Sequence, residues 1–157
     1  MAGSIYKDEH GKESPIPDCN VYWDIPAAKK VLSSDWDVIL APVDVGATAR
    51  LFDDEYAAVL NSGKIIPKMI IEQYENWTRV HPELGGNPQK FSSKLWDTVA
   101  VYLASKRDFL ELKNLPLVVN NEGYTRIDLK NGKNVFAALN WKNLPGFQKY
   151  LSETLIS

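Results

Sequence analysis

The stretch "WDVILAPVDV", Trp36–Val45, decides the fold class of this chain. Its centre is a near-continuous apolar run that ends at Pro42, and it follows "DIPAAKKVLSSD", Asp24–Asp35, which has a helical pattern. Strands buried on both faces of a parallel sheet have such continuous apolar runs. A helix followed by a buried strand therefore predicts a layered α/β fold.

The segment before this strand carries several helix signals. Asp24 is a candidate N-cap, Pro26 falls in the first turn, and Ala27, Val31 and Leu32 provide an apolar face. Residues 53–63 begin with acids and end at a glycine, and residues 66–80 have a proline near their start and one apolar face. Two further helices are predicted there.

The ends of the chain differ in character. Residues 5–18 contain glycine and prolines, which predicts an irregular surface loop. Residues 116–141 alternate β-rich runs with Asn and Gly turn signals, which predicts a small antiparallel meander, and residues 145–156 predict a closing helix. We expect one α/β domain over residues 1–157.

Composition excludes several classes of function. The 157 residues carry a formal charge of -2 and 45% hydrophobic residues, so the chain can bury a core but has no basic stripe for nucleic acid. The single cysteine, Cys19, excludes an intrachain disulfide framework. No apolar run approaches the roughly 20 residues of a membrane span, and the charged start does not resemble a signal peptide. We therefore expect no membrane partner and, by default, a cytoplasmic location.

Asp97 stands out in "KLWDTVAVYL", Lys94–Leu103, as a carboxylate at the head of an apolar helical run. If Ser92 or Ser93 caps that helix, Asp97 lies one turn inside it, on the face of Ala100, Val101 and Ala104, which we expect to pack inward. The alternative is that Asp97 is itself the N-cap, a frequent role for aspartate. The pattern alone favours the cap.

Other carboxylates and the tryptophans give weaker signals. The acids at 53–55 are interpreted as solvated first-turn residues of a helix. Asp44 ends the buried strand, and it either faces the cleft where α/β folds place ligands or caps the following turn. We expect Trp36, Trp141 and Trp77 in the core, whereas Trp23 and Trp96 are each either core or ligand contacts. These last two lie near the motifs described next.

Three stretches together carry a family resemblance: residues 20–45, "LWDTVAVYL" at 95–103 and "GYTRIDLKNGKNVFAALNW" at 123–141. In order and approximate spacing they resemble the inosine-uridine-preferring nucleoside hydrolase family. The resemblance covers nearly the whole chain but only the C-terminal half of that family's domain. It implies an open, mostly parallel sheet with flanking helices, a small antiparallel meander, and an incomplete domain.

The resemblance also implies a site. In this family a calcium ion holds the ribose diol and a water that an aspartate activates, so that the N-glycosidic bond of a ribonucleoside is hydrolysed for salvage of purines and pyrimidines. Asp97 matches the family's C-terminal calcium ligand, and Asn20 matches an asparagine that binds ribose hydroxyls. Asp18 and Met1 match further sugar contacts. Trp96 stands where well-known members have a histidine that helps the base to leave.

The sequence departs from the family in what it lacks. No Asp-rich motif of the DxDxGxDD type occurs in the 157 residues, so no residue matches the general base, and an indole cannot donate a proton near neutral pH. We expect this chain alone to be inactive and to bind Ca²⁺ weakly. Expected partners are a nucleoside or ribose-like molecule and a second chain supplying the N-terminal half; a homo-oligomer is also compatible.

Two readings of function follow. One is a nucleoside hydrolase-like enzyme, of which this chain is the C-terminal portion. The other is a non-catalytic remnant or binding module for nucleosides or a protein partner. Without the other half, the strand at residues 38–43 is expected to lack neighbours and to expose apolar surface.

Overall fold

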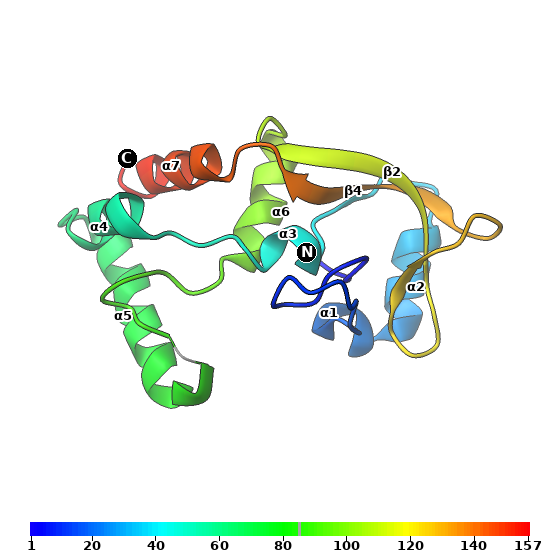
Figure 1. Ribbon diagram of the computed structural model, residues 1–157, viewed down its shortest axis with the longest axis horizontal. Coiled ribbons are helices and arrows are strands. Elements are labelled where there is room, and N and C mark those ends of the chain that lie inside the picture. The colour runs from blue at the N-terminus through cyan, green and yellow to red at the C-terminus, as the bar shows by residue number, and fades with distance from the viewer. Residues whose placement is uncertain (85) are drawn as a thin grey trace. The chain divides into compact units, whose positions relative to one another are not determined.

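The computed structural model describes residues 1–84 and 86–157, which pack as two compact units (Figure 1). The first, here called the sheet unit, comprises residues 1–48 and 96–142. The second, the helical unit, comprises residues 49–95 and 143–157. The prediction of a single domain over residues 1–157 stays a prediction.

The sheet unit is built on four strands in the order β1-β4-β2-β3. Their bounds are Ile39–Leu40 for β1, Leu110–Val119 for β2, Thr125–Ile127 for β3 and Lys133–Trp141 for β4. β1 runs parallel to β4, whereas β4–β2 and β2–β3 are antiparallel. The predicted α/β class and the antiparallel meander are confirmed. Among the described strands, parallel pairing is confined to β1 and β4.

Two helices pack with this sheet around its hydrophobic core. α1 is Cys19–Tyr22 and α2 is Ile25–Ser33, and the two are joined by a short turn (Figure 1). Leu32 of α2 packs with Leu117 and Val135 of the sheet, and Ile5 of the opening loop joins the same cluster. Residues 5–18 otherwise form neither helix nor strand, as predicted.

The start of α2 and the burial of Leu32 were predicted correctly, but the rest of its buried face was not. Asp24 caps the helix, because its Oδ1 accepts a hydrogen bond from the Ala27 N–H at 2.9 Å. The residues that face the core are Ile25, Ala28 and Leu32. Ala27 is exposed and Val31 is 47% exposed, so the face predicted from those two residues was wrong by about one position.

Among the described strands, β1 lies at the edge of the sheet and pairs with β4 alone. The expectation that this strand lacks neighbours is therefore confirmed on one side. The expected exposure of apolar surface is wrong, since Leu40 and the residues through Gly46 are buried. The chain turns at Pro42 into the short helix α3, Val43–Gly46, which keeps these side chains inside.

The helix that carries Asp97 is α6, Trp96–Ser105. Its buried residues are Val99, Tyr102 and Leu103. The face predicted to pack inward points the other way, because Asp97 and Ala104 are exposed and Val101 is 71% exposed. An almost wholly apolar helix has no polar stripe to indicate its outer face, which is why the sequence misled on this point.

The helical unit contains α4 (Asp53–Leu60), α5 (Ile65–Val80), the 3₁₀ turn η1 (Pro82–Leu84) and α7 (Leu144–Leu155). Leu51, Tyr56, Val59 and Ile71 form its core. The three predicted helices are confirmed, with the acids in the first turn of α4. In the part of the chain that the structure describes, no helix combines the length and apolarity needed to cross a bilayer.

Four of the tryptophan predictions can be assessed from burial. Trp36 is 60% exposed and Trp77 is 54% exposed, so placing them in the core was wrong. Trp141 is partly buried, and its Nε1 donates to Thr48 Oγ1 at 2.9 Å. Trp23, at the end of α1, is 80% exposed and therefore is not a core residue.

Candidate functional site

Three residues matched to substrate contacts meet at the start of the chain. The Asn20 side-chain amide donates to the Met1 carbonyl at 3.1 Å, and Asp18 Oδ2 accepts the Gly3 N–H at 3.1 Å. Asp18 and Asn20 flank the first residue of α1, so one turn of helix presents both side chains to the same segment. Asp18 is buried, Met1 is partly buried and Asn20 is exposed.

Residues 1–3 are also fixed to the end of β1. The Ala2 N–H donates to the Ala41 carbonyl at 3.2 Å, and the Val43 N–H donates to the Gly3 carbonyl at 2.8 Å. Gly3 has a φ of +80°, and a Cβ there would lie 2.7 Å from Thr125 Oγ1. Only glycine suits this position, because both the left-handed backbone and the close approach exclude a side chain.

Asp44 is a structural anchor of the opening loop. Its Oδ2 accepts the Ile5 N–H at 2.9 Å, and its Oδ1 accepts the N–H groups of Tyr6 and Lys7 at 2.8 and 3.2 Å. Asp44 as a whole residue is 5% exposed. Of the two roles considered for Asp44, neither is the one observed, because both oxygens are engaged by a segment almost 40 residues away in sequence.

Trp96 and Asp97 open α6 beside α3. A Cβ added to Gly46 of α3 would lie 2.9 Å from Trp96 Cε3, so the indole rests on the glycine. Trp96 is partly buried and Asp97 is exposed. Asp97 is the second residue of the helix, hence neither its N-cap nor a full turn inside it. Ser92 instead accepts the Leu51 N–H and donates to the Ser93 carbonyl.

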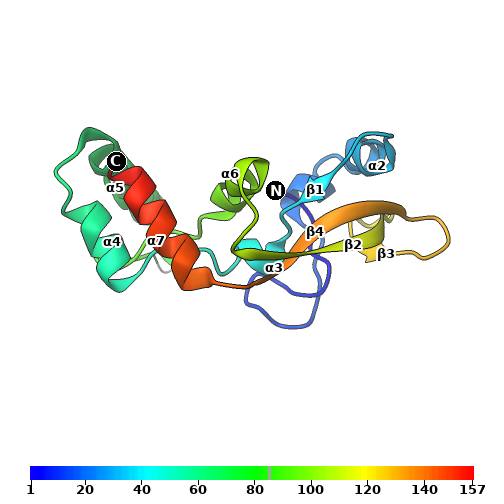
Figure 2. The ribbon, with the colours of Figure 1, turned by 90° about the horizontal axis from the view of Figure 1, so that it is seen from above.

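The short helix α3 links the two groups of candidate residues. Val43 holds the segment that Asp18 and Asn20 contact, and Gly46 supports Trp96. Both views of the ribbon place the N-terminus, α3 and α6 near one another within the sheet unit (Figures 1 and 2). The direct approach of Asp97 to Asn20 stays a prediction. The sequence analysis missed the importance of Gly46. This glycine directly follows the "DV" that ends the stretch Trp36–Val45, and its position there was the available signal.

Calcium does not fit the side chains that the structure describes. Among the residues described, no group of three or more His, Cys, Asp or Glu side chains is arranged to hold a metal ion. Asp44 is already engaged with three backbone N–H groups. Since Ca²⁺ takes six to eight oxygen ligands, Asp97 as the one matched ligand leaves most positions to water or to another source.

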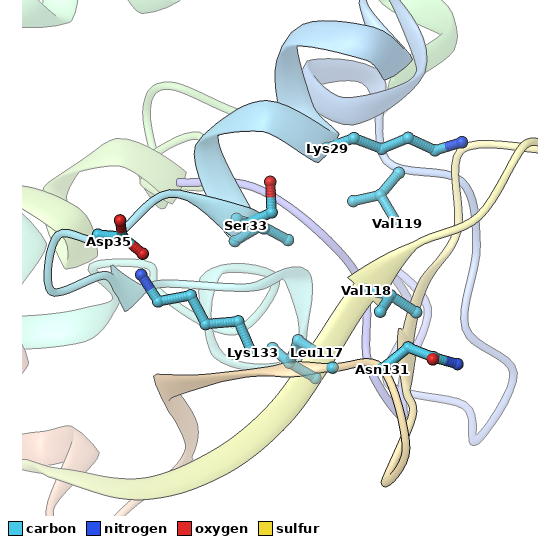
Figure 3. A pocket seen from close by; sticks show the side chains of 10 residues that line it. Lys29, Ser33, Asp35, Leu117, Val118, Val119, Asn131 and Lys133 are labelled. Atoms are coloured by element: carbon cyan, nitrogen blue, oxygen red, sulfur yellow. The ribbon is translucent and has the colours of Figure 1, made fainter.

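A hollow of about 490 Å³ lies elsewhere in the sheet unit, between α2 and the β2 and β4 strands (Figure 3). Lys29 and Ser33 line it from α2, and Val119 and Lys133 line it from the sheet. The Lys133 ammonium donates to the Trp36 carbonyl at 3.0 Å. None of the matched site residues lines this hollow, so it is a feature separate from the candidate site.

Comparisons with known proteins identify a shared fold. No family model and no curated protein matches the sequence. Among solved structures, the purine-preferring ribonucleoside hydrolase from Gardnerella vaginalis is similar over 99% of this chain, with a TM-score of 0.74 and 20% sequence identity. The chain spans 50% of the length of that enzyme's chain. The likeness establishes a nucleoside hydrolase-like fold for this chain.

Proposed function

We propose that this chain is a nucleoside hydrolase-like protein that provides the ribose-binding side of a ribonucleoside site. The fold shared over 99% of the chain carries the proposal. It is supported by the contacts of Asn20 with the Met1 carbonyl and of Asp18 with the Gly3 N–H, because they bring an amide and a carboxylate to one segment, and such groups suit the hydroxyls of a sugar. Asn20 is exposed, and its amide oxygen accepts no hydrogen bond from the described residues, so it is available to a ribose hydroxyl.

Trp96 suggests which base the site prefers. Its indole is partly buried, is held against Gly46, and directly precedes Asp97 in the chain. Stacking on an aromatic side chain contributes about 1–3 kcal/mol per base, and it grows with the size of the ring. We therefore propose that purine ribonucleosides such as inosine bind more tightly than uridine, rather than the two equally. The purine preference in the name of the similar enzyme agrees with this choice.

Hydrolysis requires groups that the described residues do not supply. Asp97 is the candidate calcium ligand, yet no cluster of carboxylates surrounds it in the described chain. The outer face of α6, with Asp97, Val101 and Ala104, is exposed and largely apolar. We propose that a polypeptide bearing carboxylates covers this face and completes both the metal site and the general base. Alone, the chain acts as a nucleoside-binding module.

Binding is tested by calorimetric titration of the 157-residue chain with inosine, uridine and ribose. We expect inosine to bind more tightly than uridine. Asn20→Ala should weaken the binding of both nucleosides, since both contain ribose. Trp96→Ala should weaken the binding of inosine more than that of uridine. Trp36→Ala, which removes an exposed indole outside the cluster, is the matched control and should leave binding unchanged. Equal loss of affinity in Trp36→Ala and Trp96→Ala, or no binding of any nucleoside, contradicts the proposal.

Catalysis is tested separately by measuring ribose release from inosine with excess Ca²⁺. We expect no release above buffer from the chain alone, because the two proton-transfer contributions, about 10²–10⁴-fold each, are missing. Release that disappears in Asp97→Ala would show that the ligand count is wrong and that Asp97 is a working calcium ligand. Release that persists in Asp97→Ala points to a contaminating hydrolase.

A further inference from the structure

The hollow between α2 and the sheet has the size of a small-molecule site. Its volume of about 490 Å³ falls within the roughly 300–1,000 Å³ of ligand pockets in proteins. One wall is α2, with Lys29, Leu32 and Ser33, and the other is made by residues 117–119 of β2 together with residues 131–133 (Figure 3). The chemistry of these two walls indicates what kind of molecule the hollow suits.

Part of the lining is apolar and fixed in place. Leu32 lines the hollow from α2, and Leu117, Val118 and Val119 line it from β2. Leu32, Leu117 and Val119 also belong to the hydrophobic core of the sheet unit, so their positions are set by packing on the other side. A ligand that enters a preformed site loses little free energy to the ordering of protein groups. This part of the lining suits a carbon chain or ring.

Two lysines lie at opposite ends of the hollow (Figure 3). At one end the Lys133 ammonium donates to the Trp36 carbonyl, and Asp35 is the residue directly before Trp36 in the chain. At the other end the Lys29 ammonium donates to Asn121 Oδ1, a neutral acceptor. An ammonium group has three N–H donors, and this bond uses one of them. Among the described residues, Lys29 has no carboxylate in ion-pair contact.

We propose that this hollow is a second binding site, which takes a small organic carboxylate with an apolar body. The carboxylate accepts hydrogen bonds from the Lys29 ammonium, and the body lies against Leu117 and Val119. The lining contains two lysines and one aspartate, so its net charge of +1 suits a monoanion. A phosphate monoester carries about -1.5 to -2 at pH 7, which exceeds the charge of this lining.

Titration of the isotope-labelled chain with hexanoate, followed by amide chemical shifts, tests the site. We expect saturable shifts at residues 29–33 and 117–119, with a Kd on the order of 1 mM for so small a ligand. Hexanamide, its neutral counterpart, should bind about fivefold more weakly, because an ion pair at a partly exposed lysine contributes about 1 kcal/mol. Equal affinities for the two ligands, or no shifts at these residues, contradict the proposal.

Three substitutions test the assignment of the charge to Lys29. Lys29→Gln should lower hexanoate affinity about fivefold and leave hexanamide affinity unchanged. Lys30→Gln removes the same charge from the next position of α2, which is exposed and outside the lining, so it is the matched control and should change neither affinity. Asp35→Asn removes the one negative charge of the lining and should raise hexanoate affinity. Equal losses in the two lysine variants, or a loss in Asp35→Asn, overturn the proposal.

The same spectra separate this site from the proposed nucleoside site, whose matched residues do not line the hollow. Inosine should shift amides around Asn20 and leave those of residues 117–119 unchanged, whereas hexanoate should do the reverse. Each ligand is thus able to fail alone, and failure of one proposal leaves the other intact. Competition of inosine with hexanoate at residues 117–119 would overturn the proposal of a separate carboxylate site.

Discussion

The indole of Trp96 rests on Gly46, with only 2.9 Å between Trp96 Cε3 and the position that a glycine Cβ would take. This contact joins the first residue of α6 to the last residue of α3. It brings together two motifs that lie 50 residues apart in the chain. The orientation of a candidate base-stacking residue thus depends on the absence of one methyl group.

Gly46→Ala is therefore expected to displace the Trp96 ring. Overpacking of a close contact typically costs about 1–3 kcal/mol, and the free energy of unfolding measured with urea should fall by that amount. Inosine affinity should fall as well, whereas uridine affinity should change less. The double variant Gly46→Ala/Trp96→Phe, with a smaller ring, should recover part of the stability. A single variant as stable as the wild type would show that the ring moves freely.

Asp44 is predicted to matter for the opening loop through its carboxylate and not through ligand binding. Asp44→Ala leaves three backbone N–H groups without their acceptor, at about 1–3 kcal/mol for each group that stays buried. Amide hydrogen exchange at residues 5–7 should accelerate in this variant. Asp44→Asn keeps one acceptor oxygen, so its exchange rates at residues 5–7 should lie between those of the wild type and those of Asp44→Ala. Asp37→Ala, an exposed aspartate just before β1, is the control and should leave exchange at residues 5–7 unchanged.

Tyr56 is expected to give the helical unit an alkaline limit. Burial, with smaller contributions from Tyr74 and Glu75, raises the pKa of Tyr56 to about 12. An unfolded tyrosine titrates near 10, so between about pH 10 and 12 the folded chain keeps a proton that the unfolded chain loses. The free energy of unfolding that the raised pKa contributes below pH 10 is therefore lost as the pH rises from about 10 to 12. The loss is up to about 1.4 kcal/mol per pH unit.

The variant Tyr56→Phe separates this effect from the hydrogen bond of Tyr56 to the Pro88 carbonyl, which is 2.7 Å long. At pH 8 the variant should be less stable by about 1 kcal/mol, because that bond is lost. Urea midpoints of the two proteins should converge as the pH rises above 10. Parallel curves across the whole range would contradict a raised pKa at this tyrosine.

Thr125→Val is expected to be neutral or stabilising. The Thr125 hydroxyl is buried beside Gly3 and, among the described residues, has no hydrogen-bond partner. Valine has the same shape but lacks the hydroxyl group. The substitution therefore removes the cost of burying that group without a partner, about 1–3 kcal/mol, and a β-branched side chain suits the strand β3. Thermal unfolding should show an unchanged or higher midpoint. A clear loss of stability would mean that the hydroxyl is satisfied by a water or a bound group.

Local sequence signals determined most of the secondary structure. Asp24 caps α2 and the acids of 53–55 begin α4, as predicted, because caps and first-turn charges act on backbone groups only a few residues away. The Asn and Gly turns of the meander act over a similar range. The resemblance carried in three short stretches also indicated the fold that the structural comparison supports.

Tertiary packing decided the rest. Which side of α6 is buried depends on the elements around it, so the outward position of Asp97 and Val101 was not visible in an almost uniformly apolar helix. The role of Asp44 was not visible in the sequence for a related reason. Its three hydrogen-bond donors are the N–H groups of residues 5–7, which lie almost 40 residues earlier in the chain. Local patterns specify where helices and strands begin and end. Contacts between residues distant in sequence decide which side chains those elements bury, engage or leave free for a ligand.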